Sequence, residues 1–121
     1  MRLAVPKERA EGERRVAATP DTVRKLVKLG FEVVIEAGAG DGARYPDGAY
    51  ADAGATVVDE VTVWADAELV LKVRPPSLEE ADRLPKGATL VSFLYPTDNP
   101  ALLQRLAERQ ITALGMDQVP R

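Results

Sequence analysis

The sequence predicts one three-layer α/β domain built on a mainly parallel sheet. Short apolar runs alternate along the chain with segments that carry helix-capping residues, and the later apolar runs are continuous. Continuous apolar runs are typical of strands that helices cover on both faces. The 121 residues suffice for a single core and contain no linker, repeat or low-complexity tract, so we expect one domain over 1–121.

The first 36 residues predict a strand, a charged loop, a helix and a second strand. The first strand, over 3–5, stops at Pro6, because proline offers no N–H to a neighbouring strand. Thr19 suits the N-cap of a helix and Pro20 its first position. A strand over 31–36 completes a βαβ unit, whose strands should be parallel and joined by a right-handed crossover.

The run 38–43, Gly-Ala-Gly-Asp-Gly-Ala, matches the dinucleotide fingerprint G-x-G-x-x-G/A directly after a strand. The fingerprint binds a pyrophosphate only if its last positions open a helix whose N-terminus faces the phosphates. Residues 44–48 continue instead with turn chemistry. We therefore expect a glycine-rich loop that carries no dinucleotide.

Eight further elements are expected in the remainder of the chain. Helical segments should cover 47–53, 60–65, 77–84 and 100–109, the third opened by an S-x-x-E capping box. Strands should cover 55–58, 68–73, 89–94 and 111–116. The side chains expected to face inward from two of the helical segments are Val61, Trp64, Leu102, Leu103, Leu106 and Ala107. This order is that of a flavodoxin-like or Rossmann-like fold.

Composition excludes several classes of function. Sixteen Lys and Arg against nineteen Asp and Glu give a net charge of −3, which argues against a nucleic-acid surface. The absence of His and Cys removes an imidazole base, a thiolate nucleophile and a Cys/His zinc site. No apolar run is long enough to span a membrane. One Asn, three Gln and nine Pro fit a thermophilic source, although GC-rich coding gives the same bias.

Four charged or polar residues fall where strands of the predicted sheet end. In open parallel sheets ligands bind beyond the carboxyl ends of the strands, so Arg15, Lys72, Tyr95 and Arg121 are the candidates for a shared pocket. The alternative is structural. Lys72 could extend from a strand end toward water, and Arg14 and Arg15 could be solvated or paired with acidic residues of their own loop, Glu8, Glu11 and Glu13.

Six motifs together resemble one family over the whole chain. They occupy residues 6–8, 15–20, 30–33, 36–40, 71–73 and 116–121. In this order and spacing they are similar to the amino-terminal domain that alanine dehydrogenase shares with NAD(P) transhydrogenase. In alanine dehydrogenases the positions of Arg15 and Lys72 hold the substrate carboxylate and carbonyl, but a catalytic histidine stands where this chain has Phe93-Leu94-Tyr95-Pro96.

The missing histidine favours the transhydrogenase alpha subunit. Amino-acid oxidation needs a proton-transfer group, whereas direct hydride transfer between two nicotinamides needs none. The resemblance implies NAD(H) as cofactor, with Arg121 at its nicotinamide end, and NADP(H) on a separate domain. It further implies proton-translocating membrane partners, a homodimer, and a cytoplasmic location peripheral to the inner membrane, with no span of its own.

The family's Rossmann domain, which bears the true dinucleotide fingerprint, is not found in these 121 residues. We therefore expect this chain, taken alone, to lack hydride-transfer activity. Two alternatives remain: an alanine-dehydrogenase-type or saccharopine-type amino-acid dehydrogenase domain, and a non-catalytic α/β module that serves protein contacts.

Overall fold

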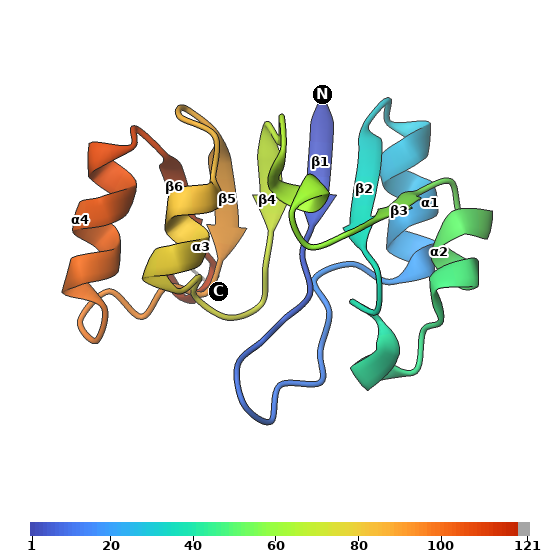
Figure 1. The fold of residues 1–121 in the computed structure, drawn as a ribbon, viewed down its shortest axis with the longest axis horizontal. Coiled ribbons are helices and arrows are strands. Elements are labelled where there is room, and N and C mark those ends of the chain that lie inside the picture. The colour runs from blue at the N-terminus through green and yellow to red at the C-terminus, as the bar shows by residue number, and fades with distance from the viewer. Residues whose placement is uncertain (119–121) are drawn as a thin grey trace.

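A six-stranded sheet in which every pairing is parallel forms the centre of the domain (Figure 1). The computed structural model describes residues 1–118. The strands, in sheet order, are β3 (Thr56–Val58), β2 (Glu32–Glu36), β1 (Arg2–Val5), β4 (Leu69–Leu71), β5 (Thr89–Ser92) and β6 (Thr112–Gly115). The parallel α/β fold predicted from the sequence is confirmed.

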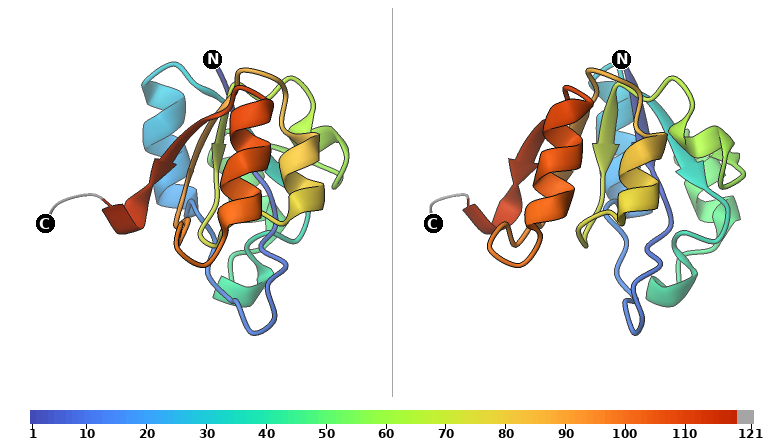
Figure 2. Two further views of the ribbon diagram at one scale, coloured as in Figure 1. Left: turned by 90° about the vertical axis from the view of Figure 1, so that its left-hand side faces the viewer. Right: turned by 60° about the vertical axis from the view of Figure 1, so that its left-hand side comes forward.

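Helices cover both faces of the sheet. They are α1 (Pro20–Lys28), α2 (Asp47–Asp52), α3 (Leu78–Arg83) and α4 (Pro100–Glu108), with short 3₁₀ turns η1 (Asp41–Ala43), η2 (Thr62–Trp64) and η3 (Met116–Gln118). Figure 2 shows α1 on one side of the sheet and α3 and α4 on the other. The strand order reverses direction between β1 and β4, which is where ligands bind in open parallel sheets.

Two apolar cores follow from the two-residue period of the strands. Leu3 and Val5 of β1 pack with Val23 of α1 and Tyr50 of α2 on one face. Ala4, between them, belongs to the opposite core, where Val70, Leu90, Leu102 and Leu106 are buried. Successive strand side chains point to opposite faces, so the central strands must be apolar throughout.

The capping signals at two helices act as their sequence predicts. The Thr19 hydroxyl accepts the N–H of Thr22 at 3.2 Å and begins α1. Ser77 and Glu80 each accept the other's backbone N–H, forming the capping box of α3. At α4 the residue in the N-cap position is Asn99, a type suited to capping, but its side chain does not cap the helix and instead donates to the Leu94 carbonyl in the loop after β5.

Two predicted core residues are wrong. Val61 is 68% exposed, and its place in the core is taken by Val63, since the 3₁₀ turn covers only Thr62–Trp64 and directs Val63 and Trp64 inward. Ala107 is exposed, because the buried face of α4 is narrower than expected and is made by Leu102 and Leu106. The predicted strands over 68–73 and 89–94 are also longer than β4 and β5.

Packing accounts for two glycines in the loop after β2. A Cβ on Gly40 would lie 2.5 Å from the Tyr45 carbonyl oxygen and 2.6 Å from the Tyr50 ring, and one on Gly42 would lie 3.0 Å from the Arg14 backbone. The helix α2 begins only at Asp47, after Arg44 in a left-handed conformation. These glycines are therefore required by close contacts, and the prediction that the loop binds no dinucleotide stays a prediction.

Of the helices in residues 1–118, none combines the length and the apolar character that crossing a membrane requires.

Candidate functional site at the carboxyl edge of the sheet

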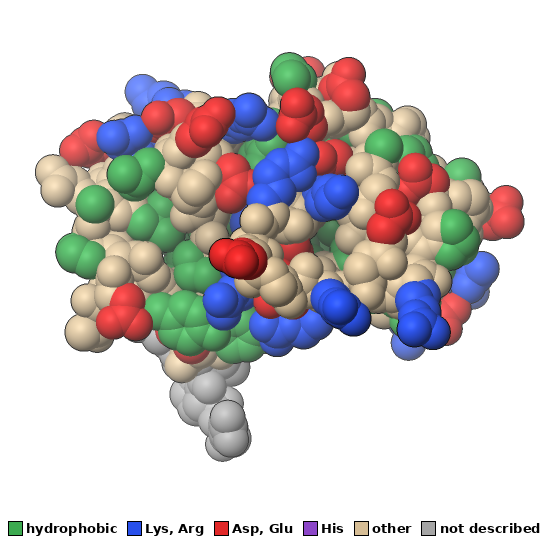
Figure 3. Space-filling view, turned by 60° about the horizontal axis from the view of Figure 1, so that its bottom comes forward, with side chains coloured by type: hydrophobic (Ala, Val, Ile, Leu, Met, Phe, Trp, Pro, Cys, Tyr) green, Lys and Arg blue, Asp and Glu red, His purple; other side chains and the backbone are tan. Residues whose placement is uncertain are grey.

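The carboxyl ends of all six strands meet at one edge of the sheet, at the bottom of Figure 1. A cleft of about 800 Å³ opens there, lined by the last residue of β2 and by residues that follow β1, β3, β4 and β5. They include Arg9, Glu36, Glu60, Arg74, Tyr95 and Asn99. Figure 3 shows this edge turned toward the viewer, with Lys and Arg side chains gathered on it among acidic ones.

Lys72 follows β4 directly and is buried. Its backbone N–H still bonds to Val91 of β5, which fixes where the side chain starts. The Nζ atom lies 3.1 Å from Oε1 of Glu8, and each of these two side chains is 2% exposed. A second carboxylate, Glu80 of α3, lies 3.8 Å from Nζ. The alternative that Lys72 extends to solvent is therefore wrong.

Glu8 joins the loops that follow β1 and β4. Besides the Lys72 ammonium, its carboxylate accepts the backbone N–H groups of Val73 at 2.9 Å and Arg74 at 3.0 Å. A buried carboxylate needs such partners, because an unpaired charge away from water is costly. The two loops that flank the reversal in strand order are thus fixed to each other by one side chain.

Arg15 pairs with Glu13 of its own loop, as the structural alternative predicted. Its Nε and Nη2 atoms donate to the two carboxylate oxygens at 2.9 and 2.8 Å, and its backbone N–H adds a third bond. These bonds lower the pKa of Glu13 to about 2 and raise the pKa of Arg15. Arg74 approaches the same carboxylate, with Nε 3.8 Å from Oε1.

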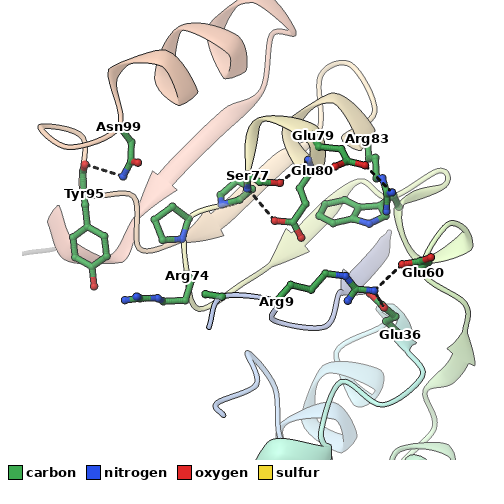
Figure 4. Close-up of a pocket in the computed structure, with 14 residues that line it drawn as sticks. Arg9, Glu36, Glu60, Arg74, Ser77, Glu79, Glu80, Arg83, Tyr95 and Asn99 are labelled. Carbon is green, nitrogen blue, oxygen red and sulfur yellow. Dashed lines mark hydrogen bonds and ion pairs between the residues drawn. The ribbon is translucent and has the colours of Figure 1, made fainter. Parts of the chain in front are cut away.

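Arg9, in the loop after β1, is bonded to residues at the ends of two other strands. Its guanidinium bonds to Glu36, the last residue of β2, and to Glu60, which follows β3, at 2.9 Å. Glu36 is buried and also accepts the N–H of Lys7 at 3.0 Å. In Figure 4, Arg9 points toward these two acids, while Arg74 extends to the other side of the cleft, where Tyr95 lies.

Tyr95 is held in an unusual backbone conformation at the rim of the cleft. Its φ is +46°, a left-handed value that costs a side-chain-bearing residue free energy. The Asp117 carboxylate accepts the N–H groups of Leu94 and Tyr95, each at 3.0 Å, and Asn99 donates to their carbonyls. These N–H bonds, that of Leu94 first, lower the pKa of Asp117.

The structure places three of the four candidate residues at one edge. Arg15, Lys72 and Tyr95 lie in the loops after β1, β4 and β5, whereas Arg121 lies outside the described residues. Their joint role in a pocket stays a prediction. Sequence reasoning did not single out Glu8, Arg9, Glu36 or Asp117 as site residues. An acidic residue at the end of an apolar strand, as at Glu36, is the signal that could have identified one of them.

The chemistry available at this edge is charge pairing and positioning. Four acidic residues at this edge, Glu8, Glu13, Glu36 and Asp117, each accept hydrogen bonds from arginine, lysine or backbone N–H groups. None of these four carboxylates is without such a partner. Within residues 1–118 no group of three acidic side chains is placed to hold a metal ion. The arrangement suits holding a polar ligand in a fixed orientation.

Comparison with known proteins gives one consistent family. The protein-family model described as "Alanine dehydrogenase/PNT, N-terminal domain" matches residues 4–121. The NAD(P) transhydrogenase subunit alpha of Cereibacter sphaeroides is 46% identical over 122 residues, which cover 100% of this chain and 23% of that subunit. The chain therefore spans about a quarter of the length of that relative.

Two solved structures share the fold. The transhydrogenase from Sinorhizobium meliloti superposes with a TM-score of 0.96 at 37% identity, covering 100% of this chain and 36% of that chain. An L-alanine dehydrogenase superposes with a TM-score of 0.90 at 37% identity, covering 95% of this chain and 32% of that chain. Both branches of the family are thus structurally similar to this domain.

Proposed function

This chain belongs to the alanine dehydrogenase/PNT N-terminal domain family, and from that premise we propose that it is part of the NAD(H)-binding alpha subunit of a proton-translocating NAD(P) transhydrogenase. The reaction would be direct hydride transfer between NAD(H) and NADP(H). The domain's part in it would be to bind and orient, because catalysis by proximity needs rigid placement of the two nicotinamides and no proton-transfer group.

Tyr95 is the observation that carries the proposal. The segment 93–96 is where alanine dehydrogenases are expected to have a catalytic histidine, and here it is a strained turn whose exposed side chain is a phenol stacked on Phe93. A neutral phenol offers no basic nitrogen of the kind that a histidine imidazole uses to accept a proton. This supports hydride exchange between nucleotides over amino-acid oxidation.

The remaining parts of the proposal concern cofactor and partners. Arg121 would contact the nicotinamide end of NAD(H), and NADP(H) would be bound by a partner domain. Membrane domains or subunits would carry the proton, and this domain would lie in the cytoplasm, peripheral to the inner membrane. A homodimer is proposed by analogy with the family. The relatives' names and the family match support the subunit assignment.

A domain exchange tests the proposal. Residues 1–121 would replace the corresponding amino-terminal segment of a transhydrogenase alpha subunit, and assembly with its partner subunits would confirm folding. We expect the chimera to transfer hydride from NADPH to an NAD analogue and to show no alanine-dependent NADH formation. Arg121→Ala should weaken NAD(H) binding selectively, and the exposed Arg44→Ala serves as its matched control.

The other outcomes separate the alternatives. Alanine-dependent formation of NADH would overturn the proposal in favour of an amino-acid dehydrogenase, for which the presence of both Arg15 and Lys72 at the carboxyl edge is the supporting observation. An assembled chimera with neither activity would favour a non-catalytic module.

A further inference from the structure

Two side chains from different elements hold the turn that follows β5. Asp117, in η3, accepts the N–H groups of Leu94 and Tyr95, each at 3.0 Å. Asn99, immediately before α4, donates to the carbonyl oxygens of the same two residues at 2.8 and 3.2 Å. Both backbone groups of two consecutive residues are thus bonded to side chains. We call Asp117 and Asn99 the clamp of this turn.

The register of the sheet explains why Asp117 reaches the turn. Ser92 of β5 lies beside Gly115 of the parallel strand β6. Two residues further along each strand, Leu94 and Asp117 therefore come to the same level. The Asp117 carboxylate continues the row of hydrogen bonds between the two strands beyond the point where β6 ends.

The shape of the turn does not require a tyrosine. Tyr95 has φ +46°, a value that glycine adopts freely but that is an outlier for a bulky side chain. Within residues 1–118, the other non-glycine residues with a left-handed backbone are Arg44, Asp66 and Gln110, which are polar and exposed. The clamp therefore offsets a strain that glycine would avoid, and its result is a tyrosine side chain in a fixed position.

The Tyr95 ring is presented at the rim of the cleft. It lies nearly parallel to the Phe93 ring, with an interplanar angle of 11° and ring centroids 6.0 Å apart, and the residue is 38% exposed. In Figure 4, Asn99 meets the backbone of Tyr95, and the ring extends in the opposite direction. Flat, partly exposed aromatic rings are suited to pack against planar heteroaromatic groups.

We propose that Asp117 is a positioning residue of the NAD(H) site and acts through the backbone of Tyr95. The inference rests on the proposed function, in which Arg121 contacts the nicotinamide end of NAD(H). Asp117 holds the Tyr95 ring where the planar nicotinamide packs against it, and Asn99 supports the same turn from its other side. The bonds of Asp117 also attach the segment after β6 to the rim, and Arg121 follows only four residues later in the sequence.

Asp117→Asn tests the inference, because it keeps the size of the side chain and replaces one of its two acceptor oxygens by a donor. The substitution would be made in the chimera that carries residues 1–121 in a transhydrogenase alpha subunit. We expect KM for the NAD analogue to rise at least roughly fivefold and KM for NADPH to stay unchanged, since only one nucleotide binds at this rim. Asp117→Glu keeps both acceptors and should restore part of the loss.

Two further variants make the test specific. Asn99→Ala removes the other half of the clamp and should give the same split between the two KM values, so it replaces Asp117→Asn if that variant does not fold. Asp98→Asn changes an exposed acid in the same loop, and it is the matched control that should leave both KM values unchanged.

Amide hydrogen exchange in the 121-residue chain shows whether Asp117 acts through the turn. In Asp117→Asn, exchange of the Leu94 and Tyr95 N–H groups should become at least roughly tenfold faster, because their acceptor is lost. The N–H groups of β1 should exchange as slowly as in the wild-type chain. A rise in KM without faster exchange at the two turn residues would show that Asp117 acts by another route.

The inference is overturned if both clamp variants leave KM for the NAD analogue unchanged in a chimera that transfers hydride. It is also overturned if both KM values rise together, since that result indicates a general loss of structure. An unsubstituted chimera that assembles and does not transfer hydride contradicts the proposed function itself, and this inference falls with it.

Discussion

At the residue scale, Lys72 and Glu8 are the most consequential pair, because both charges are buried. Replacing Lys72 by Met would leave the buried Glu8 carboxylate with only the backbone N–H groups of Val73 and Arg74 as partners. Breaking a buried pair from one side costs about 3–5 kcal/mol. We expect urea unfolding to show a loss of this size for Lys72→Met.

The exposed Lys86→Met is the control, and its effect should stay within about 0.5 kcal/mol. The double variant Glu8→Gln/Lys72→Met should lose much less unfolding free energy than the two single variants lose in sum, since both substitutions remove the same interaction. A Lys72→Met chain as stable as the control would show that the buried ion pair contributes nothing to the fold.

Glu13 makes the unfolding free energy of the chain depend on pH. Its pKa falls from the ordinary 4.5 to about 2 in the folded chain, chiefly through hydrogen bonds from Arg15. A folded pKa below the unfolded one contributes stability above about pH 4.5, and this contribution is lost as the pH falls toward 2. Because Arg15 is largely exposed, screening limits the contribution to about 0.5–1 kcal/mol.

Urea unfolding at pH 7 and at low pH would measure this effect. The difference in unfolding free energy between the two should be smaller in Glu13→Gln than in the wild-type chain by that amount. Glu11→Gln should leave the difference unchanged. Equal acid dependence in all three chains would contradict the assigned pKa.

At the element scale, the loop between β2 and α2 is shaped by glycine packing. Gly40→Ala would place a methyl group against the Tyr45 carbonyl and the buried Tyr50 ring, whose hydroxyl donates to the Ala18 carbonyl. Overpacking of this kind costs about 1–3 kcal/mol. We expect thermal unfolding at a correspondingly lower temperature for Gly40→Ala.

Gly48, in α2, is the matched control. A Cβ there meets open space, so Gly48→Ala should be neutral or stabilise the chain by up to about 1 kcal/mol. If both substitutions had the same effect, the loop would have to be looser than its contacts indicate.

The loop after β5 shows how a second element fixes a strained one. Tyr95 keeps a left-handed backbone because Asp117, in η3, and Asn99, before α4, satisfy the N–H and carbonyl groups of its turn. Strained residues persist where surrounding structure determines them, and they cluster at functional sites. The rim of the cleft is thereby coupled to the segment that follows β6.

At the scale of the whole molecule, we expect the 121-residue chain to bind NADH very weakly. Nucleotide affinity comes mainly from a helix N-terminus and backbone N–H groups around the pyrophosphate, which the loop over 38–43 does not provide. A few charge-assisted contacts of about 1.5–3 kcal/mol each are opposed by an association cost of roughly 4–15 kcal/mol.

Calorimetric titration of the purified chain with NADH is the measurement, with a buffer titration as its blank. A micromolar dissociation constant would reveal a nucleotide site within this domain that neither its glycine loop nor its carboxyl edge explains.

Short-range features of the sequence predicted most of the fold. The caps at Thr19 and Ser77 and the continuous apolar strands are short-range features, so helix starts and the parallel sheet could be predicted from them. The wrong predictions of core residues include a case in which packing decides which of two similar side chains is buried. Val61 and Val63 differ little in propensity, and only the tight turn of η2 decides which one is buried.

By itself, then, the amino-acid order determined the α/β class, the order of elements and the edge at which Arg15, Lys72 and Tyr95 lie, because strand direction is enough to place strand ends. Only the tertiary structure decided the partners of the charges that pair between different loops. Glu8 pairs with Lys72, 64 residues away, rather than with the arginines beside it. Coulombic attraction does not depend on sequence separation, so pairing follows from which loops the sheet brings together.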